Sequence, residues 1–377
     1  MRERYESMQT SDGLAWIKSS SIPESREVDA VVFDCDGVLV NSQRSYDATI
    51  VEVTKRILSE LVGISTARND YLVKLVRQLR KTGGFNNDWD STYALILFSI
   101  LALPERENRR LSQEELPDGS QKSRRVSSKR LGTVVDEFCS TPIGTRIGYA
   151  AVNSYLHTAR LTNNSRALIG TVQQKLGYPG SPPRSLLSTL FDEVYHGPQL
   201  YQSMYGAEAR HYKGRGFIEN ERLLIRMGDL RILGKLLGRG RLAIVTGRPY
   251  LAAKYVLRKM MRYFDRNASV FIGDIDVYPE LASRLAKLRK PGGRSMVHVQ
   301  RTLSSEMLLY VGDSAEDANL VENARRMKVP VLFAGIYGTE RENGEQLRFF
   351  KDREADLILP TVRVLPALLR SVKYENR

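Results

Sequence analysis

The sequence has few of the residues that build zinc sites or disulfide frameworks. Its 377 residues include two cysteines, Cys35 and Cys139, and four histidines. Two cysteines cannot form a disulfide framework, and neither Cys-x-x-Cys pairs nor histidines at metal-ligand spacing occur. The chain also lacks the phosphate loop Gly-x-x-x-x-Gly-Lys-Ser/Thr and the nucleophile elbow Gly-x-Ser-x-Gly. These absences argue against zinc-finger proteins, P-loop NTPases and serine hydrolases with a nucleophile elbow.

Long apolar runs are missing as well. No run approaches the roughly 18 apolar residues that cross a membrane, and the N-terminal stretch MRERYESMQTSDG lacks the apolar segment of a signal peptide. We therefore expect a cytoplasmic protein that has no membrane partner.

Positive charge is in excess. The chain carries 57 lysines and arginines against 43 acidic residues, which gives a formal net charge of +14. Such a balance favours anionic partners, namely phosphorylated metabolites, nucleic acid or an acidic surface. The length is large for one hydrophobic core and predicts two domains.

Strand-like and helical patterns alternate in two parts of the chain. Residues 28–39 and several short apolar runs after residue 240 read as buried strands, with helical patterns between the later ones. This alternation predicts an α/β fold with a Rossmann-like parallel sheet as its core. We assign 28–43 and 226–377 to that core, 44–225 to an inserted, mostly helical domain, and 1–27 to a loose polar arm.

The segment ERENRRLSQEELPDGSQKSRRVSSKR, residues 105–130, is charged and rich in serine. It contains almost no large apolar residues. Burial of its side chains therefore offers too little free energy to offset the conformational entropy lost on folding. We expect an exposed or disordered insertion here. Its basic end offers a contact for nucleic acid, but a solvated face is the expected role of such a charge run.

Polar residues follow three of the predicted strands. Asp34-Cys35-Asp36-Gly37 ends the first, Thr246-Gly247-Arg248 the second, and Gly312-Asp313-Ser314 the third, with Asp317 four residues after Asp313. Lys290 lies between the last two. The carboxyl ends of parallel strands meet at one edge of a sheet, which is where active groups of such folds gather. Taken singly, these residues also suit turns, helix caps and surface positions; their order and spacing favour one site.

The combination predicts phosphoryl transfer. Asp34 and Asp36, two residues apart on an extended segment, point to the same side, so Asp34 is the candidate nucleophile and Asp36 the acid and base. Mg²⁺ would let the carboxylates coexist. Its ligands are expected from Asp34, Asp36 (through the backbone carbonyl), Asp313 and Asp317, with Asp317 in an outer or helix-stabilising position. Phosphoryl contacts are expected from a further set of residues: Thr246, Lys290, Gly37, Gly247 and Arg248.

This set resembles the haloacid-dehalogenase superfamily of Mg²⁺-dependent phosphotransferases. FDCDGVLVNS is similar to the family's first motif, AIVTGR to the second, KP to the lysine motif and VGDSAEDA to the fourth. The lysine motif departs from the P-x-P that relatives often show, and Lys287 competes with Lys290. The resemblance implies a phosphatase of the first subfamily with a helical cap inserted after the first motif. Aspartate at position 36 implies hydrolysis of a C–O–P ester, since family ATPases carry threonine there and dehalogenases lack this carboxylate.

The stretch TGGFNNDWDSTYAL, residues 82–95, also resembles a signature of helical-cap phosphatases. We consider two roles for it with equal weight. In one, Asn86 and Asn87 contact substrate. In the other, Asp90 or Ser91 caps a helix over 92–101 and Trp89 lies in the core.

We therefore expect a Mg²⁺-dependent phosphatase that hydrolyses a small phosphorylated metabolite through an aspartyl-phosphate. A phosphomutase of the same fold is the alternative, and a nucleic-acid-associated phosphatase or binding protein is a weaker one because charge alone supports it. Intact Asp34, Asp36 and Asp313 argue against a non-catalytic interaction protein. The sequence leaves open the metabolite (a sugar phosphate, phosphoglycolate, histidinol phosphate or another) and the oligomeric state, a homodimer included.

Overall fold

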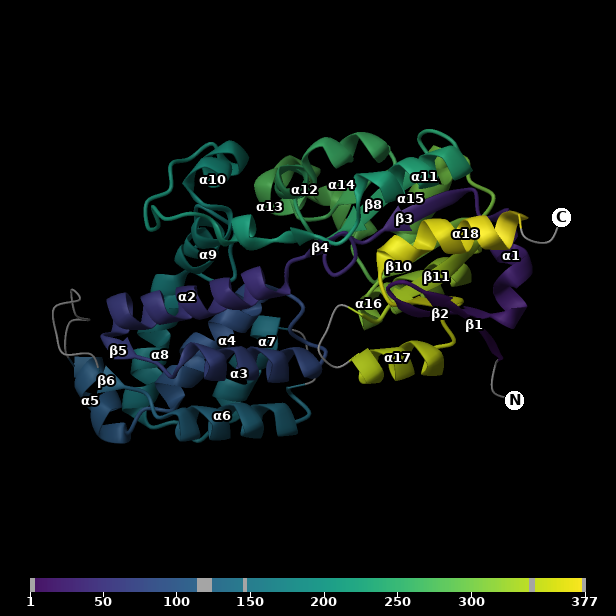
Figure 1. Cartoon of the computed structure of the whole chain (residues 1–377). Coiled ribbons are helices and arrows are strands. Elements are labelled where there is room, and N and C mark those ends of the chain that lie inside the picture. The colour runs from purple at the N-terminus through teal and green to yellow at the C-terminus, as the bar shows by residue number, and fades with distance from the viewer. Residues whose placement is uncertain (1–3, 114–123, 145–147, 339–342, 375–377) are drawn as a thin grey trace. The chain divides into compact units, whose positions relative to one another are not determined.

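The computed structural model describes residues 4–113, 124–144, 148–338 and 343–374 (Figure 1). The chain divides into two compact units, one made of Met1–Gln43 with Glu221–Arg377 and the other of Arg44–Asn220. The first unit contains the large β-sheet and the second is mostly helical. Within these described ranges, no helix combines the length and the apolar composition needed to cross a membrane.

The sheet of the first unit has eight strands in the order β1-β2-β12-β11-β10-β3-β8-β9. The strands from β12 to β9 run parallel, and the β1–β2 hairpin joins β12 in the antiparallel sense. This arrangement confirms the predicted α/β fold with a parallel core. The strands are β1 Tyr5–Thr10, β2 Gly13–Lys18, β3 Ala30–Phe33, β8 Leu242–Thr246, β9 Val270–Phe271, β10 Leu308–Gly312, β11 Val331–Ile336 and β12 Leu357–Leu359.

Apolar side chains fill both faces of this sheet. In β3, Val31 and Phe33 lie in one core and Ala30 and Val32 in the other, and all four are fully buried. A strand covered on both faces is apolar at every position, which explains the continuous run in the sequence. The first face is covered by α11 Met227–Leu237, α12 Tyr250–Leu257 and α18 Leu365–Tyr374, and the second by α15 Arg294–Leu303, α16 Ala315–Arg326 and α17 Asn343–Asp352.

Shorter elements complete the first unit. The two strands β4 Val40–Asn41 and β7 Arg222–Leu223 pair in the antiparallel sense at the points where the chain leaves and re-enters it. The short helices are α1 Ile22–Glu27, α13 Asp274–Val277 and α14 Ala282–Leu285. The 3-10 turns of the chain are η1 Ser19–Ser21, η2 Phe217–Asn220, η3 Arg258–Tyr263, η4 Pro279–Leu281, η5 Ala286–Leu288 and η6 Val362–Val364.

The N-terminal segment is part of the sheet, so the expectation of a loose arm over 1–27 is wrong. Strand β2 pairs with β12 through Ile17 and Leu357 and through Trp16 and Ile358. Ala15 and Ile17 are buried, and the Trp16 ring packs against Tyr337 with 5.4 Å between centroids. The apolar stretch GLAWIK carried this signal, but polar neighbours on both sides masked it.

The second unit is a helical bundle. Helix α4 lies at its centre, because almost all of its side chains are buried and it contacts α3, α6, α7, α8 and α9. The helices are α2 Gln43–Val62, α3 Asn69–Lys81, α4 Asp88–Leu101, α5 Glu105–Gln113, α6 Ser128–Ser140, α7 Gly148–Thr158, α8 Asn163–Leu176, α9 Leu186–His196 and α10 Pro198–Tyr205. The short strands β5 Ile64–Ser65 and β6 Arg124–Arg125 pair in the parallel sense.

The expectation of an exposed or disordered insertion over 105–130 is wrong for both of its ends. Residues 105–113 form helix α5, which packs on α8 and buries Asn108 and Leu111. At the other end Val126 is buried and α6 begins at Ser128. A single leucine and a buried asparagine suffice to anchor so short a helix, which is why composition alone misjudged the segment. Residues 114–123 lie outside the described residues.

Candidate active site

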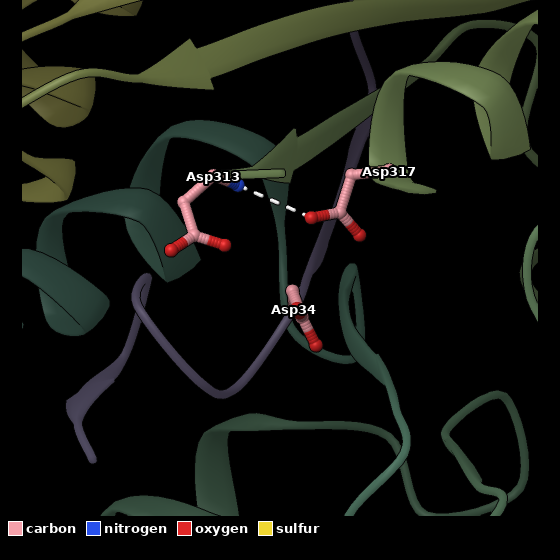
Figure 2. Close-up of side chains that lie close together, drawn as sticks. All are labelled: Asp34, Asp313 and Asp317. Atoms are coloured by element: carbon pink, nitrogen blue, oxygen red, sulfur yellow. Dashed lines mark hydrogen bonds between the residues drawn. The ribbon is translucent and has the colours of Figure 1, made fainter. Parts of the chain in front are cut away.

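Three aspartates gather beyond the carboxyl ends of two neighbouring strands (Figure 2). Asp34 follows β3 and Asp313 follows β10, and these strands pair in parallel with Phe33 opposite Val311. Asp317 lies in the first turn of α16. Ligand oxygens from all three side chains lie within 4.8 Å of one another. The structure therefore brings together the three side chains that the sequence predicts around the metal, and the fourth predicted ligand is the backbone carbonyl of Asp36.

Lys290 supplies the cation of this cluster. Its Nζ lies 3.0 Å from Oδ1 of Asp34 and 2.7 Å from Oδ1 of Asp317, and its side chain is 8% exposed. Lys287, the competing lysine, lies in η5 and is exposed. The geometry thus places Lys290, and not Lys287, at the site.

Asp317 is held by hydrogen bonds on both carboxylate oxygens. Oδ1 accepts from Lys290 and from the hydroxyl of Tyr310 at 2.7 Å each. Oδ2 accepts from the backbone N–H groups of Asp313 and Ser314 and from the Ser314 hydroxyl. Ser314 in turn accepts from the Asp317 amide, which completes a capping box at the start of α16. With both oxygens engaged, Asp317 suits the outer, helix-stabilising position better than that of a direct metal ligand.

The pKa values of the cluster show that it carries too much negative charge for its burial. Burial, reinforced by Asp317 and Asp36 against the opposing effect of Lys290, raises the pKa of Asp34 to about 7. Burial together with Asp317 and Asp34 raises the pKa of Asp313 well above its ordinary value. Burial alone would lower the pKa of Lys290, but Asp317 and Asp34 raise it well above its usual range. For Asp317, burial is outweighed by Lys290 and its hydrogen bonds, so its pKa is lowered.

This imbalance fits a divalent cation. With all three carboxyl groups ionised, one ammonium leaves two negative charges uncompensated, and the raised pKa values of Asp34 and Asp313 reflect this excess. Carboxylate oxygens are the ligands that Mg²⁺ prefers. Asp34 and Asp313 are the side chains placed to hold it, since Asp317 is already engaged.

Gly37 makes room for Asp313. Its φ is +72°, and a Cβ placed there would lie 1.7 Å from Oδ2 of Asp313. Its N–H donates to the carbonyl of Val40 at 2.8 Å. The amide of Gly37 closes the turn after Asp36, and the missing side chain admits Asp313. The phosphate contact that the sequence predicts for Gly37 stays a prediction.

The sequence predicts that Arg248 contacts the phosphoryl group. In the structure its guanidinium instead binds two carboxylates of the protein. Its guanidinium is fully buried and donates to both carboxylate oxygens of Asp36 and both of Glu221. Asp36 itself is 31% exposed at its side chain. The structure thus gives Arg248 two carboxylate partners within the first unit.

Thr246 and Gly247 lie at the end of β8, the strand next to β3. Thr246 is fully buried, and its hydroxyl oxygen accepts from the N–H of Arg248 at 3.2 Å. Gly247 is exposed and has open space around its Cα. Their positions remain compatible with the predicted contacts to phosphoryl oxygens.

Asn86 and Asn87 belong to the helical unit. Asn87 caps α4, because its side-chain oxygen accepts from the N–H of Trp89 at 2.9 Å, and Asn86 is exposed. The expected caps Asp90 and Ser91 instead lie inside the helix, which starts at Asp88. Trp89 is half-buried, and its ring N–H donates to Asp192 at 3.2 Å.

Sequence reasoning missed Tyr310, Ser314 and Glu221. Tyr310 reads as one more apolar residue of a strand, and Ser314 as part of a turn. The spacing Ser314-x-x-Asp317 is the one available signal, since it has the form of a capping box. Nothing local marks Glu221, because its partner Arg248 lies 27 residues away along the chain.

No protein-family model matches the chain, and no curated protein matches it in sequence. Similar solved structures exist. A crystal structure from the Northeast Structural Genomics Consortium has a TM-score of 0.57 at 16% identity, covering 93% of this chain and 100% of that one. Phosphatase Tt82 from Thermococcus thioreducens has 0.49 at 21% identity, covering 85% and 98%. A predicted phosphoglycolate phosphatase from Haemophilus somnus 129PT has 0.39 at 13% identity, covering 91% and 98%.

The first of these three structures exceeds a TM-score of 0.5, and the other two do not. At such identities the likeness concerns the fold. On that level, the likeness agrees with the α/β fold and its parallel sheet, which the sequence predicts.

Proposed function

We propose that the chain is a Mg²⁺-dependent phosphatase that hydrolyses a small phosphorylated metabolite through an aspartyl-phosphate. The observation that carries this proposal is the cluster of Asp34, Asp313 and Asp317 around Lys290 at the carboxyl edge of the parallel sheet. Acidic groups whose pKa values are raised by burial and by one another are typical of functional sites.

In the first step, an oxygen of Asp34 attacks phosphorus and the bond from phosphorus to the ester oxygen breaks. Asp36 donates its proton to the departing alcohol oxygen. In the second step, Asp36 takes a proton from water, the water oxygen attacks phosphorus, and the bond to Asp34 breaks to release phosphate. When bound, Mg²⁺ supplies charge neutralisation between Asp34 and the phosphoryl group.

Other residues of the first unit assist these steps. Lys290 holds Asp34 from one side and offers its positive charge to the phosphoryl oxygens. The Thr246 hydroxyl and the Gly247 amide are proposed to donate to the same oxygens. Asp317 fixes Lys290 and, through its capping box, the direction in which Asp313 leaves β10.

The inserted helical unit is proposed to act as the cap that the sequence predicts. The support is its place in the chain between β3 and β8, together with the signature at residues 82–95.

A phosphate-release screen tests the proposal. Purified protein is incubated with a panel of phosphorylated metabolites, with Mg²⁺ or with excess chelator, and phosphate and phospho-isomers are both measured. We expect phosphate release that needs Mg²⁺ and that falls by several orders of magnitude in Asp34→Asn. The exposed Asp352→Asn is the matched control in the same unit. Release undiminished in chelator or in Asp34→Asn contradicts the proposal, and isomer formation without phosphate release indicates a mutase.

A further inference from the structure

The buried guanidinium of Arg248 forms hydrogen bonds to Asp36, the side chain that we assign as acid and base. Nε of Arg248 donates to Oδ2 of Asp36 at 3.3 Å, and Nη2 donates to Oδ1 of the same carboxylate. The carboxylate is therefore held at both oxygens by the planar fork of one arginine. Such a two-point grip fixes the rotation of a carboxylate as well as its position.

The adjacent edge of the same guanidinium, which shares Nη2, binds Glu221. Nη1 of Arg248 donates to Oε2 of Glu221 at 2.8 Å, and Nη2 donates to Oε1 at 3.2 Å. The side chains of Arg248 and Glu221 are both 0% exposed. Four of the five N–H donors of a guanidinium are thus directed to two carboxylates. An arginine so engaged is not placed to move onto a phosphoryl group.

The three residues come from three segments of the first unit. Asp36 lies in the turn after β3, Arg248 follows β8, and Glu221 immediately precedes β7. Strand β7 pairs with β4, which begins four residues after Asp36. The turn that carries Asp36 is therefore anchored twice, by its side chain through Arg248 to Glu221 and by its backbone through β4 to β7.

We propose that Arg248 is a positioning residue that holds Asp36 in the orientation for proton transfer, with Glu221 holding Arg248. This inference rests on the proposed function, because it assigns Arg248 a role through Asp36. A buried ion pair is costly to form and is weak support for stability alone. An arginine with a purely structural role would also have no need to bind the partly exposed carboxylate of Asp36 in the candidate active site.

The test uses variants that avoid a lone buried charge. Arg248→Met alone strands Glu221 in the interior, so the main variant is the double change Glu221→Gln with Arg248→Met, and Glu221→Gln alone is its control. Arg248→Lys is a second variant, which keeps the charge but cannot form the fork. Thermal unfolding and Mg²⁺ binding show which variants are folded.

Two substrates separate proton transfer from phosphoryl binding. An alkyl phosphate has a leaving group that needs a proton, whereas p-nitrophenolate leaves without one. We expect the double variant to lose at least about tenfold in turnover of the alkyl phosphate, within the range that a positioned acid contributes. Formation of the phosphoryl-enzyme from p-nitrophenyl phosphate should fall by less than about threefold, and KM should change little.

A double-mutant cycle with Asp36→Asn decides the mechanism. If Arg248 acts through Asp36, adding the double change to Asp36→Asn costs less than about a further twofold. The inference is overturned if the same loss appears on both backgrounds, which indicates direct contact with substrate. It is also overturned if the folded variants turn over the alkyl phosphate as fast as the unmodified protein or faster. A failure of the proposed function is distinct, since the unmodified protein would then release no phosphate from any ester.

Discussion

Nζ of Lys290 lies 3.0 Å from Oδ1 of Asp34, although the two residues are 256 positions apart in the sequence. The pair joins the end of β3 to the loop after η5, and it gives the candidate nucleophile its one cationic partner among the described residues of the cluster. Burial raises the pKa of Asp34 to about 7 even with this ammonium in place. The site therefore lacks positive charge, and its activity should depend on Lys290 and on a bound cation.

Removal of the lysine tests its share of that charge. Lys290→Met leaves Asp34 and Asp317 without an ammonium, so turnover should fall by at least about a hundredfold, as for loss of one preorganised electrostatic contact. Lys287→Met, in the same segment but exposed, should retain full activity. Steady-state phosphate release measures both. Equal losses in the two variants would show that the site does not use Lys290.

Mg²⁺ affinity should depend on pH through Asp34. A carboxyl group binds the cation in its charged form, and the pKa of Asp34 is about 7 without metal. Protons therefore compete below pH 7, and Asp34 alone should lower the apparent affinity by up to about tenfold for each pH unit lost. Asp313, whose pKa is also raised, should add to this loss. Calorimetric titration from pH 5.5 to 8.5 measures this dependence.

Asp34→Asn is the control for the pH prediction. It should bind Mg²⁺ more weakly, with a flatter dependence on pH over the same range, because one competing proton is gone. If the unmodified protein binds Mg²⁺ equally well at pH 5.5 and 8.5, Asp34 is not a ligand.

Gly37→Ala should disturb Asp313, whose side chain supplies the three heavy atoms nearest to the new methyl group. The new methyl group would lie 1.7 Å from Oδ2 of Asp313, and φ at this position is +72°. We expect turnover to fall at least about tenfold and stability to fall by about 1–2 kcal/mol from the left-handed conformation. Gly234→Ala, with open space around it in α11, is the control and should not lower activity. An active Gly37→Ala with normal Mg²⁺ binding would contradict the assigned role of Asp313.

Helix α5 should contribute to the stability of the helical unit. Leu111 is 4% exposed, so Leu111→Ala should cost about 2–4 kcal/mol in urea unfolding of the whole chain. Gln113→Ala, exposed in the same helix, should stay within about 0.5 kcal/mol. Equal unfolding midpoints for the two variants would contradict the packing of α5 and would support the exposed insertion that the composition predicts.

The sheet and most of the site could be predicted from the sequence because their signals are local. Strand β3 is apolar at every position since both faces are covered, and Asp34 follows it directly. Parallel pairing then brings Asp313 beside it without further information. The short spacing between Asp313 and Asp317 is also a local signal. It predicts a helix-stabilising position for Asp317, which lies in the first turn of α16.

The remaining features depend on contacts between distant segments. The pairing of Glu221 with Arg248 could not be predicted from the sequence. The two residues are 27 positions apart, and no local pattern around Glu221 indicates that the fold places it beside Arg248. Strands β1 and β2 pair with a strand from the far end of the chain, so no local pattern identifies their place at the sheet edge. Asn87 rather than Asp90 caps α4, since several residues of that stretch suit the position and packing selects among them.

Trapping of the phosphoryl-enzyme tests the central claim most directly. Asp36→Asn slows hydrolysis of the intermediate, so incubation with p-nitrophenyl phosphate and Mg²⁺, followed by acid quench and peptide mass spectrometry, should find a phosphoryl group on Asp34. The signal should be absent in Asp34→Asn combined with Asp36→Asn, and absent when Mg²⁺ is chelated before substrate is added. Phosphate release by the unmodified protein with the phosphoryl group on another residue, or on none, would contradict the account.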